Sequence, residues 1–170
     1  MDDSFADFVH TRASSLVRTA HLLTGDRGHA EDLVQSSLLV AYQSWGKIRE
    51  PASAEAYVRT ILVRRVISWR RRRWRGELPT EHVPEPGTPA EDGIVERVSL
   101  WPQVLRLPER QRAVLVLAYY EDLSEAQIAE VLGCSVGTVK SHRARGLRSL
   151  RQSYDPAAAD AHGRDREEAQ

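Results

Sequence analysis

The sequence predicts an all-α protein with two small helical domains joined by a flexible acidic linker, the C-terminal domain containing a helix-turn-helix. Three observations support this. Apolar residues recur at helical spacing through much of residues 5–75 and 94–151. Residues 76–93 contain four prolines and no apolar periodicity, which is typical of a linker. Residues 123–151 form two short helical patterns around a turn at Gly133-Cys134-Ser135.

These patterns set the expected domain boundaries. The N-terminal domain comprises residues 1–75, the linker residues 76–93, and the C-terminal domain residues 94–154. Residues 155–170 are small and polar, so we expect a disordered tail.

Three helices are predicted in the N-terminal domain. The first carries apolar residues from Phe5 to Leu23 and ends at Gly25, a C-cap candidate. The second runs from about residue 28 to 45. Gly46 and Pro51 then act as stops, and Ser53 is expected to cap a third helix from 54 to about 75.

The third helix has an apolar face but carries many arginines on the rest of its surface. Trp69 and Trp74 bracket an arginine run, and residues 56–76 contain no acid. Guanidinium groups bind phosphates in bidentate fashion, and indoles can stack on unpaired bases. The pattern favours nucleic-acid binding over a solvated helix end, although Trp69 lies on the apolar face and is predicted to pack in the core.

The C-terminal domain begins near Ile94 with a helical pattern in which Pro102 should either introduce a kink or mark the true start. Pro108 and Glu109 open the next helix. Its predicted inner face consists of Val114, Leu115, Leu117, Ala118 and Tyr119.

The helix-turn-helix prediction depends on cap chemistry and charge. Ser124 and Ser135 are placed to cap its two helices, and Gly133 suits the tight turn between them. Ala129 allows the helices to cross closely, with Val139 packing beneath. The second helix has one histidine, no acid, and the cations Lys140, Arg143, Arg145, Arg148 and Arg151. This one-signed charge indicates a DNA-recognition helix.

Composition narrows the function class. The net charge of zero conceals separate basic and acidic blocks, so it does not argue against nucleic acid. No apolar run approaches the roughly 20 residues of a membrane span, and the acidic N-terminus lacks signal-peptide features. One cysteine and scattered histidines predict no metal site and no cofactor. We therefore expect a cytoplasmic protein that does not bind a membrane. We also expect a non-enzymatic protein, because the sequence shows no nucleophile–base set and no phosphate-binding loop.

The layout resembles the extracytoplasmic-function (ECF) sigma factors of bacterial RNA polymerase, which belong to the sigma-70 family. The resemblance covers roughly residues 5–152. Its most specific stretches are AEDLVQSSLLVAYQSW (30–45) and LPERQRAVLVLAYYEDLSEAQIAEVLGCSVGTVKSHRARGLRSLR (107–151), together with the arginine-rich helix between them. GCSVGTVKSH in particular is similar to the actinobacterial SigE-family branch.

The resemblance implies partners and roles by position. The partners are promoter DNA, the clamp helices of the largest subunit of core RNA polymerase and its flap region, with an anti-sigma factor as a possible addition. Residues 30–45 match the segment that binds the clamp helices, which makes Asp32, Gln35 and Ser36 interface candidates. Residues 46–75 match the regions that melt the −10 element and hold its non-template strand. The candidates there are Arg59, Arg64, Arg65, Trp69, Arg70, Arg71, Arg72 and Arg73. The linker matches a segment that threads toward the polymerase active site.

Residues 94–152 match the domain that reads the −35 element. The resemblance assigns base and backbone reading to Lys140, Ser141 and Arg145, and phosphate contacts to Thr138, Arg143 and Arg148. Two positions depart from the family pattern. Many ECF members carry asparagine and aspartate where this chain has Arg64 and Ser68, and Pro102 lies in a segment that is usually an uninterrupted helix.

A stand-alone helix-turn-helix regulator is the alternative function. Such a protein would need a ligand pocket or a dimer face in its first domain. The arginine- and tryptophan-bearing helix of this chain is better suited to single-stranded DNA, so the sequence favours a promoter-specificity subunit of RNA polymerase.

Overall fold

The computed structural model describes residues 3–48, 51–76 and 100–153, and every regular element in these ranges is helical. The first bundle contains α1 (Asp3–Thr24), α2 (Arg27–Gln43) and α3 (Pro51–Trp74), with a short 3-10 turn at Trp45–Lys47. The second contains α4 (Trp101–Arg106), α5 (Glu109–Tyr119), α6 (Glu125–Leu132) and α7 (Val136–Ser153). The all-α prediction is confirmed. The predicted linker beyond Gly76 and the predicted tail lie outside the described residues.

The turn between α1 and α2 has the predicted glycine C-cap and, in addition, an aspartate N-cap that was not predicted. Gly25 has a φ of 76° and its N–H donates to the His21 carbonyl at 2.8 Å, so the first helix ends where the glycine predicts. Asp26 caps α2, because its Oδ1 accepts from the His29 N–H at 2.8 Å. The second helix is shorter than expected, since Trp45 belongs to the 3-10 turn. The Trp45 ring packs against Phe5 at 4.9 Å between centroids.

The predicted start of the third helix is wrong. Pro51 is the first helical residue, so Ser53 lies inside the first turn and cannot be its cap. Proline is favoured at this position, because its fixed φ suits a helix and its missing N–H would have no partner there. Pro51 therefore begins a helix instead of stopping one.

In the second bundle the predicted helix starts agree with the structure, but one predicted core residue does not. Pro102 sits in the first turn of α4 and marks the helix start, one of the two alternatives expected; residues 94–99 lie outside the described ranges. Glu109 opens α5 as predicted, and residues 113–117 are all buried. Tyr119 was wrongly assigned to the inner face, since 58% of it is exposed. Five consecutive buried residues mean that α5 is covered on several sides, which a single-stripe pattern does not anticipate.

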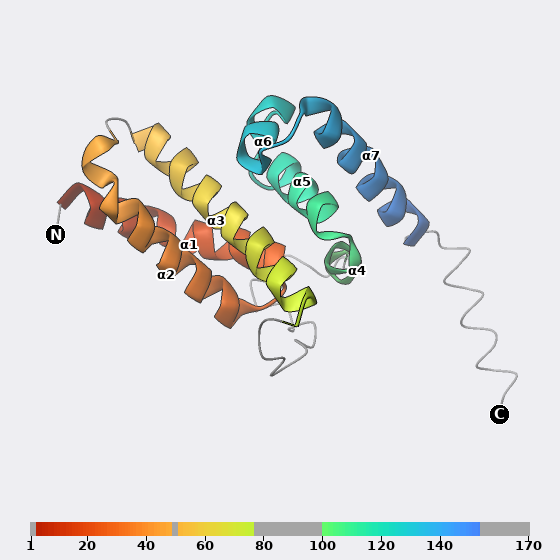
Figure 1. Ribbon diagram of the computed structural model, residues 1–170, viewed down its shortest axis with the longest axis horizontal. Coiled ribbons are helices and arrows are strands. Elements are labelled where there is room, and N and C mark those ends of the chain that lie inside the picture. The colour runs from red at the N-terminus through yellow and green to blue at the C-terminus, as the bar shows by residue number, and fades with distance from the viewer. Residues whose placement is uncertain (1–2, 49–50, 77–99, 154–170) are drawn as a thin grey trace, which may run out of the picture.

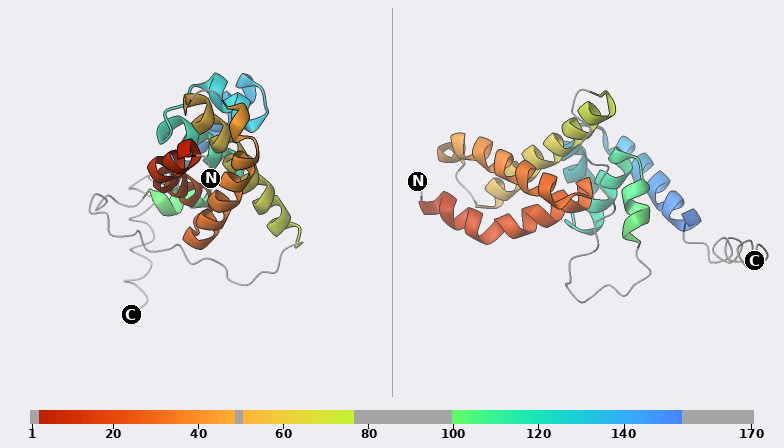
Figure 2. Two further views of the ribbon diagram at one scale, coloured as in Figure 1. Left: turned by 90° about the vertical axis from the view of Figure 1, so that its left-hand side faces the viewer. Right: turned by 90° about the horizontal axis from the view of Figure 1, so that it is seen from below.

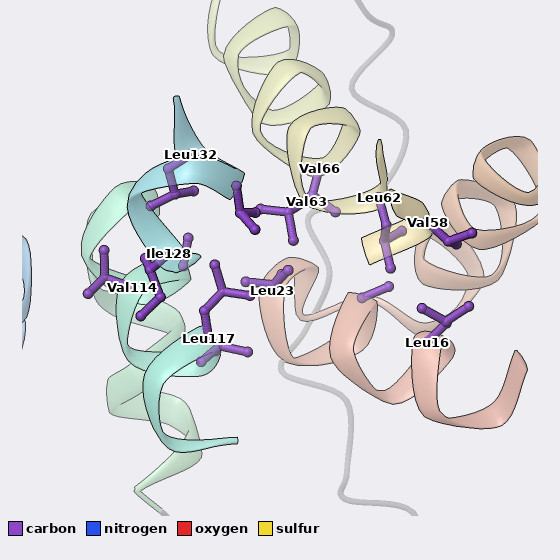
Figure 3. Packing of buried hydrophobic residues seen from close by; sticks show 14 of the residues in the cluster. Leu16, Leu23, Val58, Leu62, Val63, Val66, Val114, Leu117, Ile128 and Leu132 are labelled. Atoms are coloured by element: carbon purple, nitrogen blue, oxygen red, sulfur yellow. The ribbon is translucent and has the colours of Figure 1, made fainter. Parts of the chain in front are cut away.

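The two bundles share one hydrophobic core. Leu23 of α1 and Leu62 and Val66 of α3 belong to the same cluster of buried residues as Leu117 of α5 and Ile128 of α6. Figure 3 shows these side chains converging, with Leu23 between α5 and α3. The domains are therefore packed against each other in this structure.

Arg112 ties the second bundle to the end of α1. Its side chain is only 2% exposed and donates to the carbonyl oxygens of Leu23 (2.9 Å), Val104 (3.1 Å) and Leu107 (3.1 Å), and also to that of Leu105. A buried cation is tolerated only where its donors are satisfied, and here backbone carbonyls satisfy them. Arg112 thereby fixes the α4–α5 turn and joins it to the first bundle.

The two bundles meet through only some of their helices. In Figure 1, α3 lies between the α1–α2 pair and the second bundle, and α1 and α3 contact α5 while α3 also contacts α6. The main contacts of α7 are with α4, α5 and α6. The right-hand view of Figure 2 accordingly places α2 and α7 toward opposite ends of the molecule.

Candidate nucleic-acid interface

The helix-turn-helix forms as its cap residues predict. Ser124 and Gln127 make a reciprocal capping box at the start of α6: Ser124 Oγ accepts from the Gln127 N–H, and Gln127 Oε1 accepts from the Ser124 N–H. Gly133 ends α6 with a φ of 64°. Ser135 Oγ then accepts from the Thr138 N–H at 3.1 Å and caps α7. These local features set where the two helices begin and where α6 ends.

The outer face of α7 carries three of the predicted DNA-reading residues. Ser141, Arg145 and Arg148 are exposed, whereas Val139 and Gly146 on the opposite side are buried. A Cβ at position 146 would lie 3.0 Å from Leu115 Cδ1, so glycine permits the close packing of α7 on α5. The packing of one face therefore turns the other outward. Thr138 is held at the helix start, with its Oγ1 2.9 Å from Ser135 Oγ.

The other two predicted cations of α7 have partners within the domain. Arg143 donates from Nε and Nη2 to the Tyr119 hydroxyl (3.1 and 3.0 Å) and from Nη1 to Glu125 Oε1 (3.3 Å). The hydrogen bond to Tyr119 is the main cause of a raised pKa for Arg143. Lys140 Nζ lies 3.8 Å from Glu125 Oε2. Both cations thus lie at the edge of α7 that faces the start of α6.

His142 lies on the inner side of α7 and is partly buried. Its Nδ1 is buried without a hydrogen-bond partner among the described residues. Burial lowers the pKa of His142, and the positive charges of Arg110 and Arg145 lower it further. The folded chain therefore favours a neutral imidazole at this position.

Two of the predicted melting-helix arginines, Arg59 and Arg64, contact the second bundle, and a third, Arg70, contacts α1. Arg59 Nε donates to Glu121 Oε2 at 2.8 Å, and Glu121 also accepts from the Thr19 hydroxyl. Arg64 donates to the carbonyl oxygens of Val131 (3.0 Å) and Glu130 (3.1 Å) at the end of α6. Arg70 donates to the Leu23 carbonyl at 3.2 Å, the same oxygen that Arg112 binds. The closed packing thus uses part of the basic surface of α3.

The remaining predicted residues of α3 differ in exposure and in their partners. Arg71 and Arg72 are exposed at the C-terminal end of the helix, and the side chain of Arg73 lies outside the described part of the structure. Trp69 is 9% exposed and its ring lies 4.3 Å from that of His29, which confirms its predicted place in the core. Arg65 donates to Ser36 Oγ of α2 at 3.3 Å.

The predicted polymerase-facing residues lie along α2. Asp32 and Gln35 are exposed, and Ser36 is half-buried. Helical spacing places Leu39 on the same side of α2 as these residues. Leu39 is 63% exposed, so its apolar side chain adds to this polar face. Sequence reasoning missed Leu39, although the unbroken run Leu38-Leu39-Val40 is wider than one buried stripe needs.

Three residues that bind the predicted arginines were not themselves predicted: Glu121, which binds Arg59, and Glu125 and Tyr119, which bind Arg143.

The described residues contain no group of three side chains suited to hold a metal ion. None of their helices combines the length and apolar character that crossing a membrane requires. The fold and its basic helices define a helical DNA-binding protein with a helix-turn-helix.

Comparisons with known proteins narrow this class. Residues 8–76 match the family described as Sigma-70 region 2, and residues 99–150 match Sigma-70, region 4. The chain is 36% identical over 165 residues to the RNA polymerase sigma-E factor of Streptomyces coelicolor, covering 96% of this chain and 93% of that protein. It is 38% identical over 145 residues to the ECF RNA polymerase sigma factor SigL of Mycobacterium tuberculosis, covering 82% of each.

A solved structure has the same fold. It is the sigma factor RpoE from Bartonella quintana in complex with the anti-sigma factor NepR, with a TM-score of 0.72 and 25% identity over 89% of this chain and 98% of that one. With both family regions matched and relatives aligned over most of their length, the chain belongs to the sigma-70 family. It is an ECF sigma factor.

Proposed function

We propose that this ECF sigma factor binds core RNA polymerase and directs it to promoters by reading the −35 element with α7 and the melted −10 element with α3. The observation that carries the proposal is the helix-turn-helix, which buries Val139 and Gly146 and presents an acid-free face of α7. The match to both sigma-70 regions favours this function over a stand-alone regulator, because region 2 has no counterpart in that alternative.

For the −35 element, we assign Ser141, Arg145 and Lys140 to base and backbone reading in the major groove. Arg–guanine contacts are the commonest specific contacts there, and the exposed guanidinium of Arg145 can make one. Thr138, Arg143 and Arg148 flank this set and are suited to phosphates. Arg143 reaches a phosphate only after it releases Tyr119 and Glu125.

For the −10 element, we assign Arg71, Arg72 and Arg73 to the single-stranded backbone, a role that the exposure of Arg71 and Arg72 supports. Arg59, Arg64, Arg65 and Arg70 add to this basic surface once their present partners are released. Trp69 supports the helix from the core.

The closed packing has to open for both elements to be read. The names of the elements place them about 25 base pairs apart, roughly 85 Å at 3.4 Å per pair. A domain of this size is about 30 Å across, so two domains in contact cannot reach both elements. Residues 77–99 could reach roughly 80 Å if fully extended, which is long enough for the domains to separate.

For core polymerase, we assign Asp32, Gln35 and Ser36 of α2 to the clamp helices of the largest subunit, with Leu39 supplying the apolar centre of that face. Interfaces of this kind combine an apolar centre with a polar rim. The second bundle is assigned to the flap region. A factor working on RNA polymerase acts in the cytoplasm. We include an anti-sigma factor as a partner, because the solved relative RpoE is bound to one.

In vitro transcription with core polymerase and a promoter library tests this function. The wild-type chain should direct initiation from a recurring −35/−10 pair. Arg145→Ala should lower promoter occupancy, since one good base contact contributes about 1–3 kcal/mol of discrimination, while Arg106→Ala, at an exposed position of α4, should not. Tight sequence-specific duplex binding without a polymerase complex would instead establish the stand-alone regulator.

A further inference from the structure

Glu125 is the acid that faces the recognition helix. It is the first residue of α6, and its two carboxylate oxygens are directed at two cations of α7: Oε1 lies 3.3 Å from Arg143 Nη1 and Oε2 lies 3.8 Å from Lys140 Nζ. Although α7 itself contains no acid, two of its cations therefore have a counter-ion supplied by the neighbouring helix.

Tyr119 completes the arrangement around Arg143. Its hydroxyl accepts from both Nε (3.1 Å) and Nη2 (3.0 Å) of Arg143, and the guanidinium carbon lies 5.2 Å from the centre of the tyrosine ring. With Glu125 bound to Nη1, all three nitrogens of this guanidinium have a partner. A phosphate that approaches Arg143 has to displace these partners.

The contacts that Glu125 and Tyr119 make with Lys140 and Arg143 contribute little to the stability of the fold. The capping box of Ser124 and Gln127 already satisfies the start of α6, and the buried Ile128 and Val139 hold α6 and α7 together. The ion pairs themselves are solvent-exposed to a large degree, with 64% of the Lys140 side chain and 39% of that of Arg143 accessible. Pairs this exposed contribute little to stability. Their charge lies beside the DNA-reading face, where it matters for binding.

We propose that Glu125 is a specificity-determining residue that restrains Lys140 and Arg143 from sequence-independent phosphate binding. The proposal rests on the assignment of α7 to duplex reading. Any duplex offers phosphates, and each cation that binds one adds affinity without sequence information. Because Glu125 competes for Lys140 and Arg143, a random duplex gains less from them. At the correct site, base contacts from Ser141 and Arg145 hold α7 in the groove long enough for the phosphates to displace the carboxylate.

The test measures binding of the full-length chain to a random-sequence duplex by fluorescence anisotropy over a range of salt concentrations. Glu125→Gln should raise the affinity on the order of tenfold and steepen the slope of log K against log salt by about 1–2, since each neutralised phosphate contributes about 0.9. The matched control is Glu130→Gln, which makes the same charge change at an exposed position of the same helix where the carboxylate has no ion pair among the described residues. It should change the slope little.

Tyr119→Phe provides a second variant without any change in net charge. It removes the hydroxyl that holds Arg143, so it should raise the affinity for a random duplex, as Glu125→Gln does, and leave the melting temperature unchanged. With core polymerase, Glu125→Gln should also reduce the ratio of transcription from the selected promoter to that from scrambled templates.

Equal effects of Glu125→Gln and Glu130→Gln would overturn the proposal, because net charge alone would then explain the change. An unchanged salt slope in both Glu125→Gln and Tyr119→Phe would overturn it as well. These outcomes are separate from failure of the proposed function. That failure would appear as a wild-type chain that forms no polymerase complex, whatever the duplex measurements show.

Discussion

Glu121→Ala should open the packed domains. The Glu121 carboxylate lies in the turn between α5 and α6, where it binds Arg59 of α3 at 2.8 Å and accepts from Thr19 of α1. The side chains of Arg59 and Glu121 are only 13% and 11% exposed. In the variant, Arg59 keeps its contact with Glu55 at 3.0 Å and Thr19 keeps the Ser15 carbonyl at 3.2 Å. The substitution therefore removes a contact between the bundles without leaving a buried partner unsatisfied.

The size of the effect follows from this geometry. A hydrogen bond to a charged group contributes about 1.5–3 kcal/mol when it is shielded from water. Since 1.4 kcal/mol is a factor of ten, the ratio of closed to open chains should fall by about 10- to 150-fold. The shared apolar core remains and keeps part of the population closed.

Energy transfer between two dyes measures the opening. One dye is attached to the single native cysteine, Cys134, and the other to Ser14→Cys at an exposed position of α1. Glu121→Ala should lower the transfer efficiency. The control is Glu31→Ala, which breaks an exposed ion pair with Arg27 inside α2. If the two variants gave the same transfer as the parent chain, the Arg59–Glu121 contact would have no part in holding the domains together.

Three further substitutions test other features. Arg112→Met should lower the free energy of unfolding in urea by about 3 kcal/mol, because buried carbonyls lose their donor, while Arg110→Met at an exposed site should change it little. The lowered pKa of His142 means that stability should fall as pH drops below about 6.5, and His142→Gln should reduce this loss between pH 7.5 and 5.5 in thermal melts. Leu39→Ser should weaken binding to core polymerase in a pull-down without lowering the melting temperature. The control Leu100→Ser, at another exposed leucine, should leave polymerase binding intact.

Local chemistry explains which parts of the fold the sequence predicts. The starts of α6 and α7 depend on hydrogen bonds between residues three apart, such as Ser124 and Gln127. The residue types at these positions are enough to predict such caps. The start of α3 was misplaced because Pro51 can either stop a helix or begin one, and both uses have the same sequence signature.

The contacts between the bundles could not be predicted in the same way. Arg64 binds two backbone carbonyls of α6, and Arg112 binds four carbonyls near α1 and α4. A carbonyl is present at every position, so no residue type signals these pairings. The donors that let an arginine bind a phosphate also let it bind carbonyl oxygens, and only the three-dimensional packing shows which of the two it meets. Tyr119 was misassigned for a related reason, because its hydroxyl partner Arg143 lies on another helix.

The two helices that we propose to read DNA are restrained by different means, and this difference implies an order of events. Domain packing occupies Arg59 and Arg64 of α3, so these two arginines become available only when the bundles separate. The outer face of α7 stays exposed in the packed state, as does the proposed polymerase face of α2. Polymerase can therefore bind α2 before the chain opens, and we infer that binding at α2 precedes release of α3. A closed chain with Arg145 exposed needs a separate restraint on random duplex binding, and Glu125 is the residue placed to provide it.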